Sequence, residues 1–100
     1  METQEQPKTR EEILELSLEA RTQEVMGYQI NIDNYTIALS EISKKSLADQ
    51  AELSEFADQL RNLLSSEKLE QKKAEIMLAV IQQQVSNESN TEQKGLIQCS

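Results

Sequence analysis

Carboxylates at helical spacing are the residues in this chain whose types and positions suit chemistry. Glu52 and Glu55 are three residues apart, as are Glu67 and Glu70, so each pair would share one face of a helix. Helical di-iron sites use such glutamates together with Glu-x-x-His motifs, and the chain contains no His. The usual general base is missing for the same reason. We therefore interpret these pairs as solvated helix charges and predict no metal site.

The remaining candidate nucleophile is Cys99, the only cysteine of the chain. It lies next to the C-terminus, where no fixed positive neighbour would activate its thiol. The sequence also contains no glycine-rich phosphate loop, nucleophile elbow or cysteine pair. We expect no enzymatic activity, no catalytic residue and no cofactor.

Composition and charge narrow the class of protein further. One hundred residues make one domain at most, and two Gly and one Pro are too few for a fold with many tight turns. The formal charge of −8 argues against direct binding to nucleic acid or to anionic membranes. The polar start, the single cysteine and the lack of a long apolar run predict a cytoplasmic protein without a membrane span.

The sequence predicts one all-α domain, residues 9–86, between two disordered tails. Residues 1–8 are polar and include the only Pro, and residues 87–100 are rich in Asn, Ser and Gln. Thr9 and Glu12 have the capping-box spacing that opens a helix. We therefore expect the first helix to begin at Thr9.

A seam of nine positions, spaced alternately by four and three residues, follows this start. Eight of the nine are apolar, which is typical of coiled-coil packing, and we expect the exception, Arg21, to reach past the edge into solvent rather than pair across the seam. Met26, Ile30 and Ile37 form a second stripe away from the seam. The seam consists of Leu14, Leu18, Arg21, Val25, Tyr28, Ile32, Tyr35, Leu39 and Ile42.

Residues 28–39 also allow a different structure. Apolar and polar residues alternate on both sides of Asp33-Asn34, as in a β-hairpin. The seam continues through this segment and beyond both its ends, so we favour the helix.

The second half of the chain carries another wide apolar face. The segment 43–46 is a predicted break, with Ser46 capping the next helix. Either one helix runs over residues 47–86, or two helices meet at Ser65-Ser66. The expected fold is an antiparallel helical hairpin or coiled-coil-like bundle of two, or three, long helices. Its spare apolar residues, including Leu63 and Met77, imply a homo-oligomer or a protein partner.

Acidic residues are concentrated in the first half of the chain. Residues 1–43 hold nine acidic and three basic residues, a net charge of −6, whereas residues 61–86 have a net charge of +1. Glu11, Glu15 and Glu19, here called the acidic row, step by four along one helix. We interpret the row as a solvated face; the alternative is that it imitates duplex phosphates and occupies a DNA-binding cleft.

Four runs of this sequence resemble the small anti-RecBCD proteins of temperate phages of enteric bacteria. They are Glu12–Arg21 (EILELSLEAR), Gln23–Met26, Tyr28–Tyr35 and Glu70–Leu78, and the similarity covers about residues 12–82. The resemblance implies a non-catalytic protein that modulates the host RecBCD helicase-nuclease, sparing replicating phage DNA and favouring phage recombination. It assigns no contact residues.

The predicted function is therefore binding and inhibition or modulation of host RecBCD. The alternatives are a structural module that assembles with itself and an acidic DNA mimic, for which the acidic row would be the contact. The predicted surface for a partner or for self-association consists of Val25, Met26, Tyr28, Ile30, Ile32, Tyr35 and Ile37.

Overall fold

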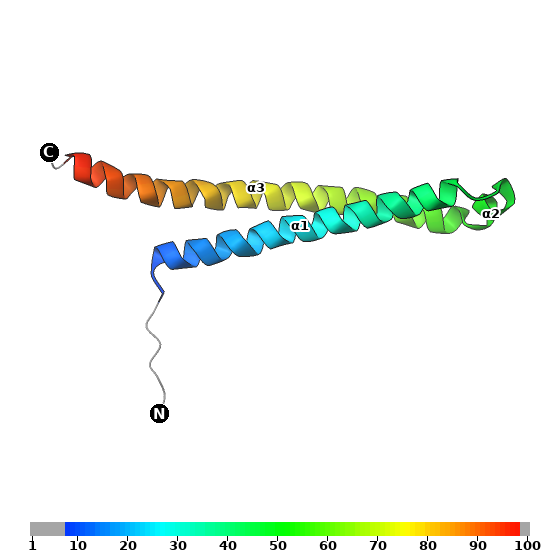
Figure 1. The fold of residues 1–100 in the computed structure, drawn as a ribbon, viewed down its shortest axis with the longest axis horizontal. Helices are drawn as coiled ribbons and strands as arrows, with labels where there is room; N and C mark the ends of the chain where they lie inside the picture. Colours follow the sequence, from blue (N-terminus) through cyan, green and yellow to red (C-terminus); the bar gives the residue numbers. More distant parts are fainter. Residues whose placement is uncertain (1–7, 99–100) are drawn as a thin grey trace, which may run out of the picture.

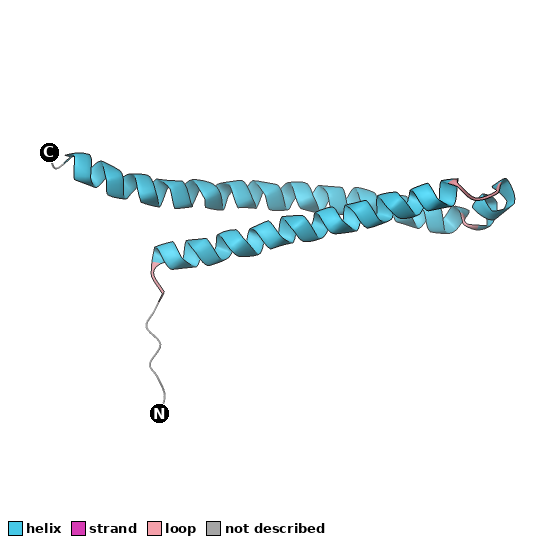
Figure 2. Ribbon diagram, in the orientation of Figure 1, coloured by secondary structure: helices cyan, strands magenta, loops and turns pink. Residues whose placement is uncertain are grey.

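The chain folds as a long antiparallel helical hairpin in a computed structural model that describes residues 8–98, with side chains as far as Glu88. Helix α1 (Arg10–Ser43) leads through a short helix α2 (Leu47–Glu52) into α3 (Ser54–Gln98), which returns alongside α1 (Figures 1 and 2). The described residues contain no strand, and residues 28–39 are helical throughout. The all-α hairpin prediction is confirmed, and the β-hairpin alternative is wrong.

Helix α1 begins with the predicted capping box. The backbone N–H of Glu12 donates to Oγ1 of Thr9 at 3.1 Å, and the backbone N–H of Thr9 donates to Oε1 of Glu12 at 2.9 Å. These bonds from Thr9, backbone first, hold the pKa of the Glu12 carboxyl below its ordinary value. The box satisfies donors that would otherwise be left free at the helix start.

The turn of the hairpin is built around α2. Ser46 caps this helix by accepting the backbone N–H of Asp49 at 3.2 Å. The side-chain amide of Gln50 donates to the carbonyl oxygens of Lys45 at 2.8 Å and Ser43 at 3.3 Å. Gln50 therefore satisfies carbonyl groups at the end of α1 and ties α2 to it.

The second half differs from the prediction in two places. The helix is interrupted at Leu53, where the backbone turns (φ −95°, ψ 9°), and not at Ser65-Ser66, which lie inside α3. Helix α3 also continues to Gln98, so residues 87–98 are helical rather than the expected loose tail. Residues 1–7 and 99–100 of the predicted tails lie outside the described residues.

The core is a single seam between α1 and α3. All nine seam positions predicted on α1 are buried or half-buried, with Leu14 and Ile32 buried. On α3 the matching residues, Ala57, Leu60, Leu64, Glu67, Gln71, Ala74, Leu78, Ile81, Val85 and Glu88, follow the same alternation of three and four. Coiled-coil side-chain packing along one stripe per helix therefore holds the hairpin together.

The molecule is thin and elongated. Its Cα radius of gyration is 22.3 Å, whereas a compact domain of this length would have about 13 Å. The two helices diverge from the α2 end toward the termini (Figure 1). Within residues 8–98, no helix has an apolar stretch long enough to cross a lipid bilayer. Because the hairpin is only two helices thick, most side chains beside the seam face solvent.

Candidate interaction surfaces

The structure divides the predicted interaction residues into two groups. Val25, Tyr28, Ile32 and Tyr35 lie in the seam, half-buried or buried along the side of α1 that packs on α3. They therefore stabilise the hairpin itself. Met26, Ile30 and Ile37 remain 58%, 57% and 59% exposed on the side of α1 away from α3, and we call them the outer stripe.

The outer stripe is unusual for a solvated helix surface. Its three side chains are large and apolar, and Ile30 follows Met26 by four residues, so the two are neighbours on the helix. Single exposed apolar residues are normal, but a row of them marks a surface that another molecule can cover.

A polar layer interrupts the seam halfway along the hairpin. Gln71 of α3 occupies a seam position and donates from Nε2 to Oε1 of Gln29 on α1 at 2.9 Å. It also points at the backbone carbonyl of Val25, 3.4 Å away. Glu67 occupies the preceding seam position, and its buried Oε2 has no hydrogen-bond partner among the described residues. Continuing the heptads from Leu60 and Leu64 would have placed both residues in the seam from sequence alone.

Tyr28 faces this layer from α1. Partial burial, and then the negative charges of Glu24, Glu70 and Glu67, raise the pKa of its phenol above the ordinary value. The carboxylates come from both helices, so Tyr28 lies between α1 and α3 on the side that holds Glu24 and Glu70. Nothing in this cluster resembles a nucleophile paired with a base.

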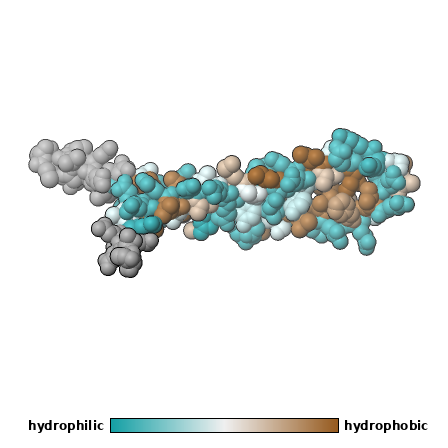
Figure 3. Space-filling model, turned by 60° about the horizontal axis from the view of Figure 1, so that its bottom comes forward, coloured by the Kyte–Doolittle hydropathy of each residue, from teal (hydrophilic) through white to brown (hydrophobic). Residues whose placement is uncertain are grey.

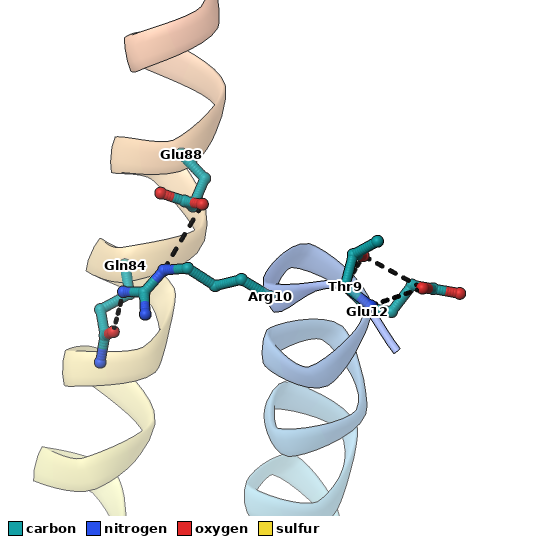
Figure 4. A network of polar contacts seen from close by, with 5 residues as sticks. All are labelled: Thr9, Arg10, Glu12, Gln84 and Glu88. Atoms are coloured by element: carbon teal, nitrogen blue, oxygen red, sulfur yellow. Dashed lines mark hydrogen bonds and ion pairs between the residues drawn. The ribbon is translucent and has the colours of Figure 1, made fainter. Parts of the chain in front are cut away.

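Arginines interact at the edges of the seam. Arg21 pairs with Glu24 of its own helix at 2.8 Å and stays partly exposed, as its predicted reach toward solvent requires. Arg10 bridges the helices at the open end: its Nη2 donates to Oε1 of Gln84 at 2.9 Å, and its Nε lies 3.5 Å from Oε1 of Glu88 (Figure 4). These exposed bonds align the two helices where they diverge.

The acidic row is exposed along its length. Glu15 and Glu19, together with Lys8, Glu12 and Leu16, line a shallow hollow of about 320 Å³, and Glu11 lies outside it. In the described part of the chain, no three acidic or cysteine side chains gather closely enough to hold a metal ion. The row is therefore an open anionic surface.

A third surface lies on α3 and contains Leu63 and Met77, which the sequence had indicated as spare apolar residues. Phe56, Leu63 and Met77, here called the flank row, are seven or fourteen residues apart on α3 and lie beside the seam, exposed. Apolar surface is visible in the space-filling view, most of it near the α2 end (Figure 3). Phe56 was the member that the sequence left undivided from seam residues such as Ala57 and Leu64. Assigning heptad positions would have separated them.

Comparison with known proteins adds no relative: no family model, curated protein or solved structure matches this chain.

Proposed function

We propose that this protein is a non-catalytic inhibitor or modulator of the host RecBCD helicase-nuclease that docks through the outer stripe of α1. One observation carries the proposal. Met26, Ile30 and Ile37 are more than half exposed, and they lie within or beside the Tyr28–Tyr35 segment, one of those that resemble anti-RecBCD proteins. The seam does not use these side chains, so they are available to a partner.

The acidic surface supports the same proposal. A protein that occupies a nucleic-acid-handling enzyme benefits from negative charge, because basic surfaces of the enzyme attract it. The exposed acidic row lies on the same helix as the outer stripe. In this proposal apolar contact supplies most of the affinity, and the carboxylates accelerate association.

The test is inhibition of purified RecBCD exonuclease on linear duplex DNA. The wild-type protein is expected to inhibit, and Ile30→Glu combined with Met26→Glu should raise the inhibitory concentration by at least about tenfold, the effect of losing one strong interface contact. Leu47→Glu is the matched control, because Leu47 is 83% exposed on α2 and outside the resembling runs. No inhibition and no binding by the wild-type protein would refute the proposal.

The acidic row separates docking from DNA mimicry. Changing Glu11, Glu15 and Glu19 together to Gln should slow association and weaken its salt dependence while leaving the dissociation rate nearly unchanged. Loss of all binding in this variant, with the outer-stripe variant still active, would favour the DNA mimic instead. A protein that binds only its own copies would favour the structural module.

A further inference from the structure

The two sides of the seam on α3 differ in composition. One side carries the flank row together with Glu70 and Gln84, so three of five positions are large and apolar. The other side consists of Arg61, Lys68, Glu75 and Gln82, which are all polar and exposed. The all-polar side has the composition of a solvated surface. The side with the flank row is richer in large apolar residues, as surfaces covered by another molecule are.

The matching side of α1 carries small residues at some positions and polar ones at others. Gln84 receives a hydrogen bond from Arg10, and Ser17, Ala20 and Glu24 of α1 share one hollow with Ile81 of α3, so this side of α1 adjoins α3. The rows that contain Glu24 on α1 also hold Asn31, Asn34, Glu41 and four small residues, and a Cβ placed on one of these four, Gly27, would meet nothing within 4 Å. The small residues are Ser17, Ala20, Gly27 and Ala38. We call this side of the hairpin the flank face.

The small residues leave a hollow on this face. It measures about 370 Å³ and is lined by Ser17, Ala20, Arg21 and Glu24 of α1 and by Ile81 of α3. Met77 precedes Ile81 by one helical turn and is exposed beside it. Methionine is the flexible apolar side chain best suited to filling such an irregular space.

The exposed area leaves room for a second chain. The accessible surface is 7895 Å². For a compact monomer of 11.4 kDa the size scaling gives only about 5,800 Å². The difference is roughly 2,000 Å². A standard interface takes about 800 Å² from each partner, which is less than half of that difference.

We infer that a second copy of this chain covers the flank face, with α3 of each copy lying against α1 of the other. A two-fold axis parallel to the helices places α3 of one copy against α1 of the other, and Met77 of each copy enters the hollow of its partner. Such an interface is self-complementary, as two-fold symmetry requires. The result is a four-helix bundle. The outer stripe stays outside it, so this inference does not depend on the proposed function.

Sedimentation equilibrium of the full chain tests the dimer. The wild-type protein should be a dimer at micromolar concentration, and Leu63→Glu or Met77→Glu should weaken it by about tenfold or more. Ile76→Glu is the control, because Ile76 is 64% exposed on the same helix but away from the flank face. A wild-type monomer, or equal weakening by Ile76→Glu, would overturn the inference and leave the face to a different protein.

Cysteine cross-linking tests the arrangement without disturbing the charge of the face. In a Cys99→Ser background, Ala20→Cys chains and Met77→Cys chains are mixed and oxidised. Disulfides joining one chain of each kind are expected. Disulfides joining only two Met77→Cys chains would place α3 against α3 and overturn the arrangement, and absence of any disulfide would count against it as well.

Discussion

Gln71 of α3 donates a 2.9 Å hydrogen bond to Gln29 of α1 within a seam that is otherwise mostly apolar. Gln29 in turn donates to Oδ1 of Asp33 at 2.9 Å, which holds its amide oxygen toward Gln71. Gln71 is a half-buried seam residue and Gln29 is exposed beside the seam, and a polar residue at a seam position favours the alignment in which it reaches its partner. The bond therefore fixes the level at which α3 lies against α1.

Removing the acceptor should destabilise the hairpin. Gln29→Ala leaves the half-buried Gln71 amide without this partner, and we expect a loss of about 1 kcal/mol in the free energy of unfolding. Urea denaturation followed by circular dichroism measures the loss. Gln23→Ala, an exposed position on the same helix, is the control; an equal loss there would contradict a specific role for the bond.

Glu67 should limit stability rather than support it. Its Oε2 is buried without a partner among the described residues, and such a group costs about 1–3 kcal/mol. Glu67→Leu removes the carboxylate and adds an apolar seam residue, so the free energy of unfolding should rise by about 1 kcal/mol or more. Glu75→Leu, at an exposed position of α3, should change little. If the two variants are equally stable, the buried carboxylate of Glu67 does not lower the stability of the hairpin.

Alanine substitution should lower stability at Ile32 and partner binding at Ile30, although the two isoleucines are only two residues apart. Ile32 is 7% exposed in the seam, and truncating a buried isoleucine to alanine costs about 2–5 kcal/mol. Ile30 belongs to the outer stripe, so Ile30→Ala should leave the melting temperature almost unchanged while weakening binding to the partner. Thermal melts and the exonuclease assay report the two effects separately. A large loss of stability in Ile30→Ala would contradict its outward position.

The sequence was sufficient for the hairpin because each long helix repeats one pattern. The alternation of four and three from Leu14 to Ile42 identified every α1 seam position, and Thr9 and Ser46 identified two helix starts. The interruption at Leu53 was missed because its residues are ordinary helix formers and only tertiary packing decides where the chain turns. The helical backbone of residues 87–98 was missed because their composition favours a tail.

The candidate surfaces were less predictable. The predicted surface combined Tyr28, Ile32 and Tyr35 of the seam with Met26, Ile30 and Ile37 of the second stripe because all six are apolar and close in sequence, although the seam spacing already separated the two sets. The flank row needed the heptad position of each α3 residue. Glu67 and Gln71 interrupt the apolar pattern there, so the seam across residues 65–73 could be followed only by continuing the heptads from Leu60 and Leu64.

Acid should weaken the start of α1 through Glu12. Its pKa is lowered in the folded chain by the hydrogen bonds from Thr9, so the stabilisation is present above the unfolded pKa of about 4.3 and is lost as pH falls through the lower folded value. Glu12→Gln should remove this dependence. The melting temperatures of the two proteins, measured between neutral and acidic pH, should converge at low pH. Glu11 does not close the capping box, so the melting temperature of the control Glu11→Gln should follow that of the wild type at every pH.

Alkali should weaken the hairpin through Tyr28. Its pKa is raised in the folded chain by partial burial and by the nearby carboxylates of Glu24, Glu70 and Glu67. The unfolded chain therefore loses this proton first, at about pH 10, and stability falls as pH rises through the higher folded value. Tyr28→Phe keeps the ring without the ionisable group, so its stability should depend less on pH in this range.

The chain offers a direct measurement of this shift, because Tyr28 and Tyr35 are its only tyrosines. In a Tyr35→Phe variant, the ultraviolet absorbance of tyrosinate reports Tyr28 alone. Its midpoint should lie at higher pH in the folded protein than in concentrated urea, and Glu70→Gln should bring the two midpoints closer because one repelling charge is gone. If the folded and unfolded midpoints coincide while Glu70 is still present, the carboxylates of α3 do not affect the pKa of Tyr28. That result would contradict its position between the helices.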